Sequence, residues 1–311
     1  MPNLVGIGNS QAPTNAMLGG LAYQDSVGEI TIDKIKARTS DTATNVFVYD
    51  TRKDSDGGAW RHRTQNTSWY NEGVSQGRGA RKEFPSVAVI VAYNNGLRIY
   101  DGDDPNLPMW MEAWQYQNDS SGSTNWWGGS GTGTSVAAMN GTVVLGTTTG
   151  AKVLHFISDR MSNFYTPASG NYTQPGGVAN RNDPYTVWLP SDEYYAQIVN
   201  SNIEDVAMTV LSNAPTDINT GLPIPTFAVA TDGGVSVIRD DRNVYDTVAT
   251  TSGYVQSRKV EFSESGEYLY IIQDPSLIYS YKTSAFNIDR SSGTLSGYAA
   301  LSFFSGYVSN S

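Results

Sequence analysis

The sequence of 311 residues has no cysteine, two histidines and no apolar run long enough to cross a membrane. Without cysteine, disulfides, thiol nucleophiles and cysteine-ligated metal sites are excluded. A membrane helix needs about 18 consecutive apolar residues, so membrane insertion is not expected. The stretch from Met1 to Leu18 lacks the basic and apolar regions of a signal peptide.

Catalytic motifs are missing as well. The sequence has no G-x-S-x-G, no phosphate-binding loop, no G-x-G-x-x-G and no H-E-x-x-H. His62 lies between two arginines and His155 in an alternating apolar run, and both settings favour a structural role. A glycosidase needs only two carboxylates, but the sequence nominates no particular pair. We therefore expect no enzyme activity, no cofactor and no metal site.

Charged residues are sparse, at 16% of the chain, and the net charge is −10. The acidic excess lies after residue 82, because the segment before it is slightly basic. Non-specific binding to nucleic acid needs a basic surface, so nucleic acid is not an expected partner. An acidic body favours solubility and partners that are neutral or cationic.

Helical periodicity is nearly absent, and a β-hairpin phrase recurs in its place. The phrase is clearest from Thr134 to Asp159, where Asn140-Gly141 separates two apolar runs. Asn-Gly at such a place is typical of a type I′ hairpin turn. Similar phrases begin at Ser86, Thr226 and Val260, and Val206 to Leu211 reads as a weaker copy. The repeats predict an all-β fold, mainly a multi-bladed β-propeller over residues 42–311, with a β-sandwich as the alternative.

Two acidic turns interrupt the first strands, Asp54 to Gly58 and Asp101 to Asn106. Each has carboxylates of the kind that bind hard cations, but Asp, Asn, Gly and Pro are also the ordinary residues of turns, and we favour the turn. After the first of them, Ala59 to Arg63 alternates and predicts a return strand. Gly73 to Lys82 is polar and rich in glycine, which indicates a long loop or a domain seam.

Residues 1–41 differ from the rest, with many glycines and too few apolar residues for a core. We expect a docking arm that orders against another subunit, and a flexible tail is the alternative. The apolar residues that would dock are Leu4, Ile7, Leu18, Leu21 and Tyr23.

Two long loops, Asn118 to Gly133 and Arg160 to Asn202, concentrate aromatic residues. Loops on a rigid scaffold commonly carry recognition, and Tyr and Trp dominate binding hot spots. We therefore predict a partner or glycan surface there, with packed anchors as the alternative. The residues concerned are Trp126, Trp127, Tyr165, Tyr172, Trp188, Tyr194 and Tyr195.

Three phrases carry a resemblance to a known family: Leu4 to Asp25 (LVGIGNSQAPTNAMLGGLAYQD), Asn45 to Glu72 and Pro85 to Met111. They resemble the N-terminal parts of virion proteins from marine tailed phages, of which cyanophages are the best-known carriers. The resemblance implies a structural tail protein, such as a fibre or nozzle subunit, and no enzyme activity. It implies other tail subunits as partners and a homo-oligomer in the particle.

On this reading the chain is made in the host cytoplasm, resides in the virion tail and is released by lysis. A host surface glycan or protein is a further expected partner. The competing hypothesis is a propeller that binds or cleaves surface carbohydrate, using Asp103, Asp104, Asp192 or Glu193 beside the tryptophans. A soluble cellular scaffold is a third, and it leaves the N-terminal phrase unexplained.

Overall fold

The structure is a computed structural model, and its fold is all-β. Besides Asp33, it describes residues 43–75, 77–114, 131–165, 172–174, 176–183, 189–190, 197–241, 243–247, 256–273 and 277–285. The expected arm lies outside these residues except for Asp33. No helix in these ranges is long and apolar enough to cross a membrane.

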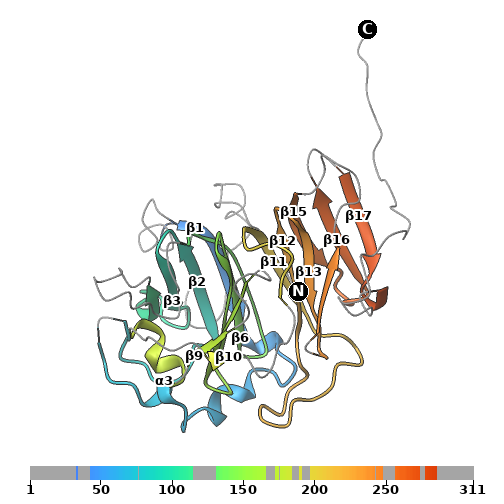
Figure 1. Cartoon of the computed structure of the whole chain (residues 1–311). Coiled ribbons are helices and arrows are strands. Elements are labelled where there is room, and N and C mark those ends of the chain that lie inside the picture. Colours follow the sequence, from blue (N-terminus) through green and yellow to red (C-terminus); the bar gives the residue numbers. More distant parts are fainter. Residues whose placement is uncertain are drawn as a thin grey trace.

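The described strands form four antiparallel sheets that follow one another along the chain (Figure 1). The first sheet contains β1 (Ala43–Asp50), β2 (Val87–Tyr93), β3 (Gly96–Asp101) and β4 (Met109–Trp114). The second contains β5 (Gly133–Met139), β6 (Thr142–Thr147), β7 (Gly150–His155), β8 (Arg160–Phe164), β9 (Tyr172–Gln174) and β10 (Leu189–Pro190).

The third sheet contains β11 (Ile203–Thr209), β12 (Thr226–Thr231), β13 (Gly234–Ile238) and β14 (Val244–Thr247). The fourth contains β15 (Ser257–Phe262), β16 (Tyr268–Gln273) and β17 (Leu277–Lys282). In every sheet the strands are neighbours in sequence order. The weak copy predicted at Val206 is therefore the opening strand of the third sheet.

The hairpin turns explain why the repeated phrase was visible in the sequence. Asn140 and Gly141 both have positive φ, 48° and 70°, as a type I′ turn requires. Gly150 and Gly234 both have a φ of 127°. At each, a threonine three residues earlier donates its hydroxyl to the glycine carbonyl, from Thr147 at 2.7 Å and from Thr231 at 2.9 Å. The second and third sheets thus share the same turn chemistry.

The sheets pack face to face through their opening strands, with β1 beside β5, β5 beside β11 and β11 beside β15. Residues that alternate along one strand enter different cores: Val143 and Leu145 of β6 face the first sheet, and Val144 faces the third. The two middle sheets are consequently buried on both faces. Antiparallel sheets stacked in chain order around their opening strands are the blades of a propeller-type fold, which confirms the predicted fold class.

A segment of mainly helical turns joins β1 to β2. It contains η1 (Thr51–Lys53), η2 (Ala59–Arg63) and α3 (Ser68–Asn71), and two more short helices follow later, η3 (Val178–Asn182) and η4 (Thr283–Ala285). The predicted return strand at Ala59 to Arg63 is wrong, because this is η2. Gly57 and Gly58 turn the chain with positive φ, and burial of Trp60 then outweighs the alternating pattern.

Gly73 to Lys82 is a loop packed on the first sheet rather than a domain seam. The Gly79 N–H donates to the Trp110 carbonyl at 2.9 Å, and Arg78 forms a bridge with Met111. Aromatic side chains from this part of the chain fill the core between the first two sheets. Phe84 has its ring centroid 4.8 Å from that of Trp110 and 4.9 Å from that of Phe156.

Candidate functional site

Most of the residues expected at a partner surface lie outside the described residues. This holds for Trp126, Trp127, Trp188, Tyr194 and Tyr195, and for all five apolar residues of the arm. Tyr172 is described only as part of the backbone of β9. The prediction for these residues therefore stays a prediction.

Tyr165 is the exception, and its hydroxyl contacts a residue of its own chain. Lys152 Nζ donates to Tyr165 Oη at 2.7 Å, and the ammonium lies 4.3 Å from the centroid of the same ring. Lys152 is fully buried. Burial penalises its charged form and lowers the pKa of Lys152 to about 7. Sequence reasoning missed this lysine, because lysine is rarely fully buried and the alternating run around Lys152 does not mark it as an exception.

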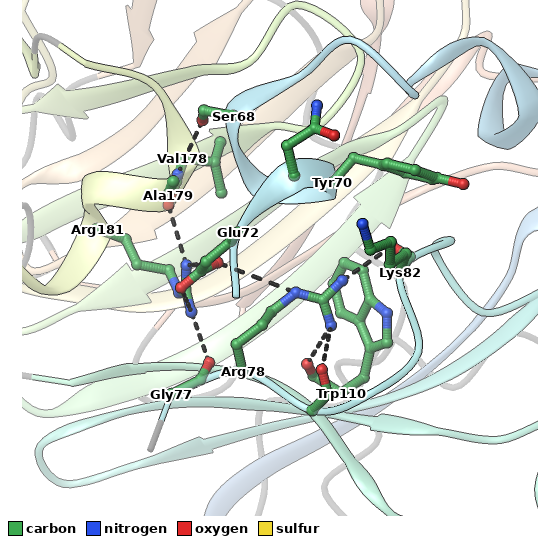
Figure 2. Close-up of polar contacts among 12 residues, drawn as sticks. Ser68, Tyr70, Glu72, Gly77, Arg78, Lys82, Trp110, Val178, Ala179 and Arg181 are labelled. Atoms are coloured by element: carbon green, nitrogen blue, oxygen red, sulfur yellow. Dashed lines mark hydrogen bonds and ion pairs between the residues drawn. The ribbon is translucent and has the colours of Figure 1, made fainter. Parts of the chain in front are cut away.

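Three charged side chains lie together beneath the surface, and we call them the Glu72 cluster: Glu72, Arg78 and Arg181 (Figure 2). Glu72 directly follows α3, Arg78 lies in the loop between α3 and β2, and Arg181 belongs to η3. Both guanidinium groups are almost completely buried, at 2% and 1% exposure for Arg78 and Arg181.

Arg181 is the centre of the cluster. Its Nη1 and Nη2 donate to the two oxygens of Glu72 at 2.8 and 3.2 Å, which is the bidentate geometry of strong ion pairs. Its remaining contacts are main-chain carbonyls, with Nε 2.8 Å from Glu112 O and Nη2 2.5 Å from Gly77 O. Arg181 therefore connects η3 to the loop and to β4.

Arg78 completes the cluster from the other side. Its Nη1 donates to Trp110 O at 2.8 Å and its Nη2 to Lys82 O at 2.9 Å, and its guanidinium lies 4.5 Å from the centroid of the Trp110 ring. Its Nε is 3.9 Å from Glu72. Burial lowers the pKa of Arg78 to about 10, with Glu72 opposing the shift and Arg181 adding to it. The cluster thus holds two buried cations against one partly buried carboxylate.

A second set of polar contacts joins α3 to η3, and Figure 2 shows one of them, between Ser68 and Ala179. Asp159, held at a φ of 54°, accepts hydrogen bonds from the Ser68 hydroxyl at 2.8 Å and from the Val178 N–H at 2.9 Å. Ser68 Oγ in turn accepts from the Ala179 N–H at 3.1 Å. The connecting segment of the first sheet is thereby fixed to the second.

Two buried aspartates join neighbouring blades. Asp54 accepts from Tyr49 Oη at 2.5 Å, Trp60 Nε1 at 2.7 Å and the Asn140 N–H at 2.8 Å. Asp205 on β11 accepts from the Ser135 hydroxyl at 2.8 Å and the Val260 N–H at 3.2 Å, so it reaches three sheets. Burial raises the pKa of both Asp54 and Asp205 to about 6. Their hydrogen bonds oppose that shift.

The acidic turn at Asp101 to Asn106 is held by hydrogen bonds and ion pairs with residues outside the turn. Asp103 accepts from the Ser86 hydroxyl and N–H and from the Val87 N–H. Arg81 pairs with Asp101 at 2.7 Å and with Asp103 at 2.8 Å. Burial alone would raise the pKa of Asp103, but these hydrogen bonds lower it. In the described ranges no three His, Asp or Glu side chains gather as metal ligands.

A small cleft opens where the β5–β6 turn meets the loop before β12. Asn140, Thr142, His155, Asp217 and Thr220 supply its polar lining. His155 Nδ1 lies 3.5 Å from Thr142 Oγ1, and Asp217 accepts from the Asn219 N–H at 2.7 Å to form a turn. Asp103 and Asp104 lie elsewhere, and Asp192 and Glu193 are outside the described residues. Of the carboxylates considered for carbohydrate cleavage, the two that the structure describes, Asp103 and Asp104, are not part of this cleft.

No protein-family model matches the chain, and a search of curated proteins finds no match. Solved structures with some likeness include the computationally designed Ika4 protein, at 10% identity and a TM-score of 0.30, covering 63% of this chain and 84% of that one. Another is Hsv2p of Kluyveromyces lactis, at 10% identity and a TM-score of 0.25, covering 68% of this chain and 76% of that one. Scores at this level carry no argument about function.

Proposed function

We propose that this chain is a structural subunit of a bacteriophage tail that assembles with other tail subunits and contacts the host surface. The observation that carries the proposal is the resemblance of Leu4 to Asp25, Asn45 to Glu72 and Pro85 to Met111 to virion proteins of tailed phages. The all-β, propeller-type fold is compatible with such a subunit.

Particles assembled with the full chain or with a chain lacking residues 1–41 test this function. We expect mass spectrometry of purified particles to find the full chain as a regular component. The shortened chain should fold, because the four described sheets begin at Ala43, and it should be depleted from particles because the arm is missing. Absence of the full chain from particles would refute the tail assignment. Equal incorporation of both chains would refute the arm alone.

A propeller that binds or cleaves surface carbohydrate is the second candidate, and the Trp126-Trp127 pair favours it. Stacked aromatic side chains contribute on the order of 1–2 kcal/mol each at binding hot spots. Replacing both tryptophans with alanine should therefore weaken assembly or adsorption by more than about tenfold. Circular dichroism should show an unchanged fold. If the double variant unfolds, the two side chains are core anchors, and both partner and glycan roles fail for this loop.

A further inference from the structure

The fourth sheet differs from the other three in what covers it. The central strands β2, β6 and β12 are buried along nearly their whole length. On β16 burial alternates instead: Leu269 and Ile271 face the third sheet, whereas Tyr270 and Ile272 are 40% and 37% exposed. Among the described residues, Tyr270 and Ile272 thus lie on a face of this sheet that the third sheet does not cover.

Neighbouring strands extend this face. Ile278 of β17 is paired with Ile272 in the sheet and is 39% exposed. We call Tyr270, Ile272 and Ile278 the outer strip. Among described residues the other large apolar side chains that are exposed, Val74 and Ile218, stand alone on loops. Grouped exposed apolar residues mark interaction surfaces, whereas scattered ones do not.

Charges border the outer strip in an order that is complementary to itself. On β15, Lys259 is opposite Ile272 and Glu261 is opposite Tyr270, and Val260 between them points into the core. Consider a second copy packed on this face and related by a two-fold axis. The axis lies parallel to the sheet, runs across its strands, and passes over β16 between Tyr270 and Ile272. That axis places Lys259 of each copy over Glu261 of the other, and Tyr270 over Ile272.

We propose that the outer strip is a dimer interface, at which two copies of this chain pack their fourth sheets face to face and antiparallel. A two-fold interface uses the same patch on both copies, and the alternating charge on β15 meets that requirement. Apolar residues at the centre with charges at the rim is the usual arrangement of a protein interface. The inference goes beyond the proposed function, because it depends on this face and not on the chain's place in a tail.

Charge reversal provides the test, with the full chain studied by sedimentation velocity over a range of concentrations. Wild type should dimerise. Lys259→Glu and Glu261→Lys should each weaken self-association by about tenfold or more, because two like-charge contacts replace two ion pairs. Mixed in equal amounts, the two variants should form a heterodimer of near wild-type affinity, since their charges then complement each other again.

Two further variants separate the interface from folding. Ile272→Glu, at an exposed position, should abolish the dimer with an unchanged circular dichroism spectrum. Ile218→Glu, at a position 95% exposed on a distant loop, should leave dimerisation intact. A monomeric wild type would overturn the proposal. Failure of the mixture to recover would overturn the antiparallel pairing. Presence in purified particles is independent of these results.

Discussion

Replacing Glu72 with alanine should destabilise the protein by roughly 3–5 kcal/mol, the range found when one partner of a buried ion pair is removed. The reason is the surplus of positive charge that remains. Arg181 would lose its bidentate partner at 2.8 and 3.2 Å, and Arg78 would lose the carboxylate that lies 3.9 Å from its Nε. Both guanidinium groups are buried, so the loss of their carboxylate partner leaves their desolvation poorly compensated. Urea denaturation at neutral pH measures the change.

Glu267 provides the matched control for Glu72. It also pairs with a cation, Lys282 at 3.9 Å, but the two side chains are 58% and 62% exposed. Exposed pairs contribute about 0–1 kcal/mol, so Glu267→Ala should scarcely change the denaturation midpoint. Glu72→Gln should fall between the two, because the amide oxygen can still accept one hydrogen bond. A Glu72→Ala loss no larger than that of the control would show that the cluster does not support the fold.

Replacing Lys152 with methionine should stabilise the protein, and by an amount that depends on pH. The pKa of Lys152 is lowered from 10.5 to about 7 by burial. Between these values the unfolded chain binds a proton that the folded chain does not, so the unfolding free energy of wild type rises with pH across that window. Below about pH 7 the lysine is charged in both states, and its full burial cost is present.

The methionine variant lacks this titration. Its advantage should be largest near pH 7, on the order of 3 kcal/mol after allowance for the lost hydrogen bond to Tyr165, and should shrink steadily towards pH 10. Unfolding free energies of both proteins at pH 7, 8, 9 and 10 give the comparison. Lys282→Met is matched in chemistry but changes an exposed side chain, so burial cannot produce the effect there. A gain independent of pH would exclude titration of Lys152 as its cause.

Local signals in the sequence were sufficient for most strands of the four sheets. The prediction of one long loop over Arg160 to Asn202 is wrong, because β8, β9 and β10 of the second sheet lie within it. Asn140-Gly141 predicts its turn because few other pairs tolerate two positive φ angles. The apolar runs of β6 and β12 predict strands because each is buried on both faces. The wrong prediction of a strand at Ala59 to Arg63 has a tertiary cause. In η2 the buried Trp60 donates to Asp54, and an alternating pattern over five residues cannot predict that contact.

Local sequence patterns could not predict the buried ion pairs or which face of the fourth sheet is exposed. Glu72 and Arg181 are separated by 109 positions, and each alone reads as an ordinary surface charge. Lys152 reads as the polar residue of a half-exposed strand, whereas its strand is covered on both sides. Tyr270 and Ile272 alternate with Leu269 and Ile271, and only the sheet order shows which set meets a neighbour.

The four sheets pack in the same order in which they occur along the chain, and this affects how the chain folds during synthesis on the ribosome. Each sheet packs mainly on the one synthesised just before it, so folding can proceed in step with synthesis. The segment between β1 and β2 is the exception. Its polar groups bond to residues that are synthesised much later. The Ser55 N–H donates to the Asn140 side chain, Trp69 Nε1 donates to the Phe156 carbonyl, and Glu72 accepts from Arg181. The first blade therefore emerges early but becomes complete only when most of the second has left the exit tunnel.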